Sequence, residues 1–319
     1  MINIIFSEEY KNHDTGNHPE SIKRIEVVNN LIKEEYTNCK LIEPSIADKK
    51  LISLVHDTDY VNYIFDSIPA SGFNYFDPDT IASPNSLKSY LLAVGGSVDA
   101  VKKIIEDNNK KNVYFCAHRP PGHHAEKNKA MGFGVFNNVA ISAEYALRSG
   151  KFKKILIVDF DVHHGNGTQH IFENSKNIYY ASSHQYPFYP GTGSENERGT
   201  GNIFNCPLTA GCDSKTFRSL FENKIINKIN NSFDLIYFSA GFDAHKFDPL
   251  ASINLQNEDF YWVTKIVLEK LANNVPIISV LEGGYDMKGL LHGLNSHLKA
   301  LIEYSNCLLY TSPSPRDCQ

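Results

Sequence analysis

Five short runs of apolar residues recur along the chain after residue 110, and each is a candidate for a buried β-strand. Within each run the apolar residues are mostly continuous rather than alternating, which is typical of parallel strands covered on both faces. The predicted strands are Val113–Ala117, Ile155–Asp159, Ile178–Ser182, Leu235–Ala240 and Ile277–Leu281.

Apolar residues at helical spacing lie between many of these strands. The predicted helices are Ser86–Asp107, Val135–Arg148, Ser214–Asn230, Asn257–Asn273 and Met287–Tyr304. Strands that alternate with helices predict an α/β fold, in which an open parallel sheet is flanked by helices. The chain shows no internal repeat and no interior linker, so we expect a single domain that spans residues 1–306.

The end of the chain differs in character from the rest. Residues 307–317 read CLLYTSPSPRD, which resembles one reading frame of a sequencing adapter. We expect residues 307–319 to be a disordered scar of that origin and exclude them from the domain. The alternative is a regulatory tail rich in proline and serine.

Polar segments follow the predicted strands at the point where each strand ends. They are Arg119–Glu126, Asp159–Gln169, His184–Gly201, Gly241–Leu255 and Glu282–Asp286. In open α/β sheets, ligands bind outside the carboxyl ends of the strands. We therefore expect these five loops to form one site.

Composition and charge narrow the class of protein. Hydrophobic residues make up 42% of the chain and charged residues 21%, which is ordinary for a globular protein. The net charge of −5 provides no broad basic field for nucleic acid. The N-terminal segment lacks the features of a signal peptide, and no apolar run approaches the length of a membrane span. The six cysteines include no CxxC pair, which favours reduced thiols and a cytoplasmic location.

Asp159, Asp161 and His163 occupy alternate positions as the chain leaves the second predicted strand. Residues two apart on a strand point to the same side, so Asp161 and His163 can bind one divalent metal ion. A third ligand has to come from another loop, and Asp243 is the candidate, although such an aspartate can also serve as a helix cap or turn residue. Three protein ligands leave a position for water and substrate, as in catalytic zinc sites.

Two further motifs suggest groups that handle protons and developing charge. His123 and His124 follow RPPG, whose prolines and glycine fix the backbone, and rigid placement is what a general base needs. Asp159 and Asn166 are available to orient the two imidazoles. Tyr285 follows two glycines, and its hydroxyl could stabilise an oxyanion. The alternatives are ordinary loop histidines and a structural tyrosine.

These motifs, in this order and spacing, resemble those of the zinc-dependent histone deacetylase superfamily, and in particular class II-like bacterial histone deacetylase-like amidohydrolases. The motifs that carry the resemblance are RPPGHHAEKNKAMGFGVFNN, DFDVHHGNGTQ, YPGTG, SAGFDAHKFDPL and LEGGYD. The resemblance runs from His13 to Leu301. It implies an arginase/deacetylase-like fold.

The resemblance also implies two metal sites. The catalytic Zn²⁺ would bind to Asp161, His163 and Asp243. A structural K⁺ would bind to Asp159, to the backbone of Asp161 and His163, and to the region of Ser182 and Ser183.

For catalysis, the resemblance implies that His124 is the general base and then the general acid, with His123 as its electrostatic partner. Tyr285 would donate a hydrogen bond to the oxyanion, and Asp159 would orient its histidine. Asn166 stands where class I relatives carry Asp, and its neutral amide favours an uncharged imidazole.

For substrate binding, the resemblance implies a narrow acyl-lysine channel. Phe133 would form one wall and Tyr189 the other, at a position where many relatives carry Phe. The remaining implied contacts are Gly132, Gly283, Gly284, Leu250 and Asp79, with Asp77 as the alternative to Asp79. Polyamine-specific class II members carry a Glu at the position of Leu250, so the leucine favours acetyl-lysine in proteins or peptides.

The expected activity is hydrolysis of the acetyl-lysine amide with release of acetate. The first alternative is an acetylpolyamine or other small acetylated amine as the substrate, with the same mechanism. A manganese ureohydrolase shares the fold, but this chain lacks the DAHxD pattern of its binuclear site. A non-enzymatic acyl-lysine-binding module is the third alternative. The sequence does not determine the oligomeric state.

Overall fold

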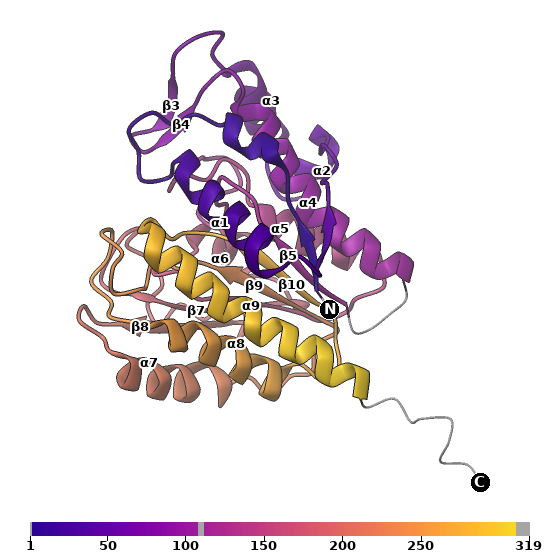
Figure 1. Ribbon diagram of the computed structural model, residues 1–319, viewed down its shortest axis with the longest axis vertical. Helices are drawn as coiled ribbons and strands as arrows, with labels where there is room; N and C mark the ends of the chain where they lie inside the picture. Colours follow the sequence, from indigo (N-terminus) through magenta and orange to yellow (C-terminus); the bar gives the residue numbers. More distant parts are fainter. Residues whose placement is uncertain (1, 108–111, 311–319) are drawn as a thin grey trace.

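The computed structural model describes residues 2–107 and 112–310, with side chains described as far as residue 306. Within these residues a parallel sheet of eight strands forms the centre of the molecule (Figure 1). In spatial order the strands are β2 (Lys40–Ile42), β1 (Asn3–Ile5), β5 (Val113–Cys116), β10 (Ile277–Leu281), β9 (Leu235–Ala240), β6 (Ile155–Asp159), β7 (Ile178–Gln185) and β8 (Ile203–Leu208).

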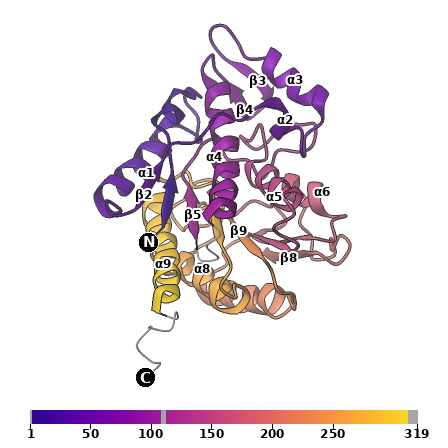
Figure 2. The ribbon, with the colours of Figure 1, turned by 90° about the vertical axis from the view of Figure 1, so that its right-hand side faces the viewer.

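Helices cover both faces of the sheet, as Figure 2 shows. One face is covered by α1 (Ile22–Glu35), α8 (Asn257–Leu271) and α9 (Met287–Tyr310), and the other by α4 (Ser86–Asp107) and α5 (Asn138–Arg148). Because successive strand residues point to opposite faces, each central strand supplies side chains to the apolar cores on both faces of the sheet. In β6, Leu156 and Val158 pack on the first side, and Ile155 and Ile157 on the second.

A smaller helical layer lies beside the main sheet. It contains α2 (Lys49–Ile52), α3 (Thr58–Asp66) and the antiparallel hairpin of β3 (Asn74–Asp77) and β4 (Thr80–Ala82). Its apolar core, which includes Val61 and Ile64, packs against α4 and α5. Thr80 of this hairpin accepts a hydrogen bond from the backbone of Phe133 at 3.1 Å, so this layer helps to place the predicted channel wall.

The remaining elements are the 3₁₀ helix η1 (Glu8–Asn12), α6 (Asn166–Phe172), α7 (Ser214–Phe221) and the π-helical turn η2 (Glu222–Ile226). The helix predicted at Ser214–Asn230 is therefore an α-helix only as far as Phe221, continues as a π-helix to Ile226 and ends before Asn230. Helix α5 begins at Asn138 and not at the predicted Val135. The reason is that the Asn137 side chain caps the helix by accepting from the Ala140 amide at 3.0 Å.

The predicted α/β fold with an open parallel sheet and a single domain is confirmed. Three predicted strands, β6, β9 and β10, have the predicted bounds. Helix α9 ends at Tyr310, which is beyond the boundary expected at residue 306, and residues 311–319 lie outside the described residues. No helix among the described residues combines the length and the apolar character needed to cross a membrane.

Candidate active site

Four neighbouring strands deliver the predicted metal-binding and catalytic residues to one edge of the sheet. The strands β5, β10, β9 and β6 stand side by side in that order. The loops that follow them carry, in the same order, the histidine pair, Tyr285, Asp243 and the pair Asp161 and His163. Adjacent parallel strands therefore explain why residues far apart in the chain meet.

Asp161, His163 and Asp243 form a buried cluster with one donor atom of each within 4.8 Å of the others. His163 Nδ1 lies 3.0 Å from Asp243 Oδ2 and 3.3 Å from Asp161 Oδ1. Backbone amides fix both carboxylates: Val162 N–H donates to Asp243 Oδ1 at 2.8 Å, and Gly283 N–H donates to Asp161 Oδ2 at 2.8 Å. The predicted ligands are thus brought together.

The charge of this cluster fits a divalent cation. Burial, and then the charge of Asp161, raise the pKa of Asp243 to about 7. Two carboxylates at this depth repel each other unless a positive charge lies between them. Carboxylate oxygen and imidazole nitrogen are donors that zinc accepts, and three ligands are typical of a catalytic zinc site. The donor set therefore fits Zn²⁺.

His123 and His124 differ in their partners. His123 Nδ1 lies 2.9 Å from Asp159 Oδ2, and His124 Nδ1 lies 2.8 Å from Asn166 Oδ1. Burial acts to lower the pKa of His123, but the charges of Asp159 and Asp161 and the hydrogen bond to Asp159 together outweigh it and raise the pKa to about 10. Burial, with His123 beside it, holds the pKa of His124 well below its usual value. The arrangement favours a neutral His124 imidazole next to a positively charged His123 imidazole.

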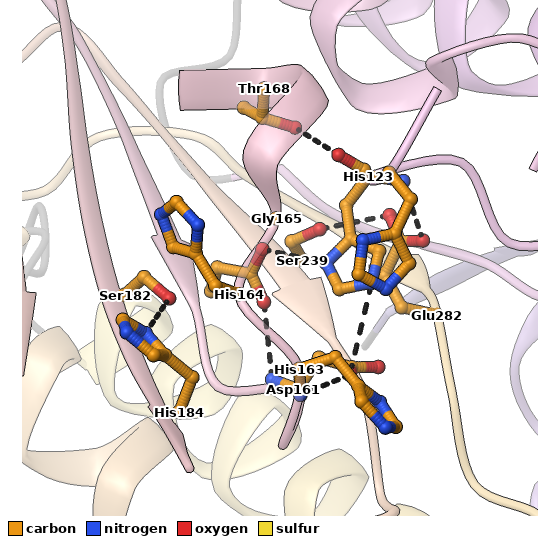
Figure 3. Close-up of polar contacts among 12 residues, drawn as sticks. His123, Asp161, His163, His164, Gly165, Thr168, Ser182, His184, Ser239 and Glu282 are labelled. Atoms are coloured by element: carbon orange, nitrogen blue, oxygen red, sulfur yellow. Dashed lines mark hydrogen bonds and ion pairs between the residues drawn. The ribbon is translucent and has the colours of Figure 1, made fainter. Parts of the chain in front are cut away.

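Glu282 fixes the backbone of the histidine turn (Figure 3). Its Oε2 accepts from the amides of Gly122 at 2.7 Å and His123 at 3.2 Å, while its Oε1 accepts from Ser239 Oγ at 2.8 Å. This residue is the second of the motif LEGGYD, and no role was predicted for it from the sequence. The sequence feature that could have indicated a role for Glu282 was its position directly after β10.

Arg24 and Asp248 hold the turn that carries Tyr285. Arg24 Nε donates to the Gly284 carbonyl at 2.7 Å, and its guanidinium lies 5.0 Å from the centre of the Tyr285 ring. Asp248 Oδ2 accepts from the Tyr285 amide at 2.6 Å. Burial raises the pKa of Tyr285 well above 10, so its hydroxyl stays protonated and can donate a hydrogen bond.

A cavity of about 170 Å³ opens onto these groups. Its lining residues are Asp79, His124, Gly132, Phe133, His163, Phe188, Tyr189, Leu250 and Tyr285. The ring of Phe133 meets Tyr285 edge to face at 5.4 Å between ring centres, and Tyr189 meets His124 in the same way at 5.2 Å. The lining of the cavity is mostly aromatic, and His163 is the member of the candidate metal cluster that contributes to it.

Phe188 is a lining residue that the sequence analysis missed. Its ring stacks on His163 with 5.6 Å between ring centres. Its place next to Tyr189 in the same loop was the only sequence signal.

Some predicted residues lie away from the cavity wall. Gly283 sits behind it, where a Cβ would lie 2.3 Å from Asp243 Oδ2, so only glycine lets the turn approach the carboxylates. Gly284, at φ +123°, faces Phe242 and α9. Ser182 lies opposite Asp159 in the β6–β7 register and hydrogen-bonds His184 at 2.8 Å (Figure 3). Potassium binding stays a prediction.

Comparison with known protein families identifies the family of the chain. Residues 18–301 match the histone deacetylase domain. The chain belongs to the histone deacetylase family. The match covers most of the chain and confirms the resemblance inferred from the motifs.

Relatives of this histone deacetylase family member come from several kingdoms. An uncharacterized protein of Synechocystis is 37% identical over 312 residues, which cover 95% of this chain and all of that protein. The chloroplastic histone deacetylase 14 of Arabidopsis thaliana is 33% identical over 91% of this chain and 74% of its own length. The crystal structure of the HDA15 HD domain superposes with a TM-score of 0.86 at 30% identity, covering 97% of this chain and 95% of that one.

Proposed function

We propose that this protein is a zinc-dependent deacetylase that hydrolyses the acetyl amide of acetyl-lysine in proteins or peptides and releases acetate. One observation carries the proposal: the buried cluster of Asp161, His163 and Asp243 reaches, through His163, the cavity that His124 and Tyr285 also line. A metal site, a base and a hydrogen-bond donor in one apolar channel are what amide hydrolysis needs.

Zinc held by Asp161, His163 and Asp243 would supply a Lewis acid and lower the pKa of water at the site. His124 is placed to accept the proton of the attacking water at Nε2, because its Nδ1 faces Asn166. His124 then delivers that proton to the leaving amine. His123, paired with Asp159, keeps a positive charge beside the reaction, and this charge favours a neutral His124.

Tyr285 would donate a hydrogen bond from its hydroxyl to the oxyanion. Its ring is fixed by Phe133 on one side and by the guanidinium of Arg24. Because Asp248 and Arg24 hold the backbone, the hydroxyl is placed in advance and needs little reorganisation in the transition state.

The shape of the cavity supports an acyl-lysine substrate. Phe133 and Tyr189 would enclose the methylene chain, and Leu250 adds apolar surface without charge. Asp79, in the turn of the β3–β4 hairpin, could accept hydrogen bonds from the substrate backbone. A small acetylated amine would use the same chemistry but would gain no ion pair from Leu250.

The proposal has two further parts, a structural cation and a location in the cell. A structural K⁺ would lie near Asp159 and Ser182, which are neighbours in the sheet. The buried free thiols of Cys116, Cys206 and Cys212 fit the cytoplasmic location expected from the sequence.

The direct test compares substrates on one zinc-loaded preparation. Acetyl-lysine peptides should be hydrolysed, a chelator should abolish turnover, and added zinc should restore it. Acetylspermidine assayed in parallel tests the small-amine alternative. Tight binding of an acetyl-lysine peptide without any hydrolysis would instead support a binding module.

A further inference from the structure

Asn166 connects the proposed base to a carboxylate outside the active site. Its Oδ1 lies 2.8 Å from His124 Nδ1. Its Nδ2 donates to Glu126 Oε1 at 2.5 Å and to the backbone carbonyl of His124 at 3.3 Å, and it lies 3.4 Å from Met131 Sδ. The amide therefore has one end on the base and the other end on hydrogen-bond acceptors.

The direction of this amide decides which nitrogen of His124 carries the proton. With Oδ1 towards the ring, His124 must donate from Nδ1, and its Nε2 keeps the lone pair that a base needs. If the amide turned over, its N–H group would face Nδ1, and the proton would move to Nε2. A turned Asn166 would thus leave His124 in the wrong tautomer for accepting a proton.

Glu126 opposes that turn. A carboxylate only accepts hydrogen bonds, so a turned Asn166 would place its carbonyl oxygen against a charged oxygen. The cost is large because Asn166 is buried and the Glu126 side chain is only 18% exposed. An aspartate at position 166 would have no such ambiguity, because both of its oxygens accept.

His170 keeps Glu126 charged and in place. Asn166 and His170 are four residues apart in α6 and so lie on the same face of the helix. His170 Nδ1 lies 2.7 Å from the same Oε1 of Glu126. Burial acts to raise the pKa of Glu126, but hydrogen bonds from His170 and Asn166 outweigh it and lower the pKa, and nearby Lys129 adds to this effect.

We propose that Glu126 is a positioning residue, which acts through Asn166 to hold His124 in the tautomer protonated at Nδ1. The effect of Glu126 on turnover rests on the proposed deacetylase function. Its effect on the tautomer of His124 does not. Glu126 does not line the cavity and does not touch substrate in this scheme.

A double-mutant cycle in the zinc-loaded protein tests the proposal. Glu126→Ala should lower kcat about tenfold with little change in KM, as expected for loss of an outer-shell partner. In the Asn166→Asp background the same substitution should not lower kcat, because there is no amide to direct and a repulsion between carboxylates is removed. An equal loss in both backgrounds would show a merely structural role.

Two variants provide matched controls. Glu126→Gln keeps one oxygen that can accept from both Asn166 and His170, so it should retain most of the activity lost in Glu126→Ala. Glu144→Ala removes a glutamate of matching side-chain exposure, 19%, that pairs with Arg148 on α5. It should leave kcat unchanged in both backgrounds.

The tautomer itself can be observed by ¹⁵N NMR of the imidazoles in the same zinc-loaded variants. The His124 resonances should report protonation at Nδ1 in the wild type, and a loss of that form in Glu126→Ala. An unchanged tautomer in Glu126→Ala would overturn the proposal. If no variant hydrolyses an acetylated substrate, the deacetylase function fails, but the NMR result still decides the role of Glu126.

Discussion

The backbone amide of Val162 donates a hydrogen bond to the carboxylate of Asp243 over 2.8 Å. This bond joins the loop after β6 to the loop after β9 within the proposed metal cluster. Asp243, itself a proposed ligand, therefore also fixes the backbone between the other two proposed ligands, Asp161 and His163.

We expect Asp243→Ala to abolish both zinc binding and activity, because it removes one of three ligands and the partner of Val162 N–H. Asp243→Asn is the matched control for the loss of the Val162 partner, since the asparagine carbonyl oxygen can still accept from the Val162 amide. Metal analysis of the purified variants measures occupancy. Full zinc content in Asp243→Ala would remove Asp243 from the ligand set.

Tyr285→Phe should act on the transition state and not on folding. Its turn is held through the backbone by Asp248 and Arg24, and the ring contact with Phe133 persists in the variant. Loss of one oxyanion donor costs about 10²–10³ in rate. Steady-state kinetics should show this loss in kcat, while thermal unfolding should give nearly the same Tm. An unchanged kcat would mean that the hydroxyl is not used.

The sequence predicted the central part of the fold and the site because both depend on local patterns. Continuous apolar runs marked β6, β9 and β10, and the polar motifs followed directly. Since carboxyl ends of parallel strands share one edge, the site could be inferred before the order of the strands was known.

What the sequence could not predict depends on contacts across the chain. Strands β1 and β2 have three residues each, too few to show a pattern. Arg24 lies on α1, 260 positions before the Gly284 carbonyl that it binds, and nothing near it indicates that role. The direction of Asn166 is likewise set by Glu126, forty positions earlier.

Acid should destabilise the fold through His297. Its imidazole is fully buried, between Thr264 Oγ1 at 2.6 Å and Ser279 Oγ at 2.8 Å, and burial lowers its pKa to about 3. The unfolded chain takes up a proton below about pH 6.5, whereas the folded chain does not until about pH 3. The folded state therefore loses stability as the pH falls through this window, by about 2 kcal/mol at pH 5 from this residue alone.

Denaturant unfolding at pH 7.5 and pH 5.0 measures this contribution. His297→Gln cannot be protonated, so its free energy of unfolding should fall by about 2 kcal/mol less than that of the wild type between the two pH values. His118 and His56, whose pKa values burial lowers to about 3 and about 4, act in the same direction and remain in both proteins. An identical fall in both would show that His297 does not contribute.

Leu250→Glu should shift substrate preference towards acetylated polyamines. Leu250 lines the cavity, and Asp248 holds it there by accepting from its amide at 3.0 Å. A second ammonium group of a polyamine finds apolar surface at this position, so the wild type should prefer acetyl-lysine peptides in kcat/KM. One added charge pair at a partly desolvated site is worth roughly 1–3 kcal/mol, about 5–150-fold.

Leu250→Gln separates charge from shape in this experiment, because it has nearly the same size as the glutamate but carries no charge. Only Leu250→Glu should narrow or reverse the ratio of kcat/KM for acetyl-lysine peptide to that for acetylspermidine. An equal change of this ratio in both variants would show that polarity or packing, and not charge, causes the effect. A wild-type preference for acetylspermidine would overturn the peptide assignment, yet it would leave the roles of Asp161, His163 and Asp243 intact, because the same metal chemistry serves both substrates.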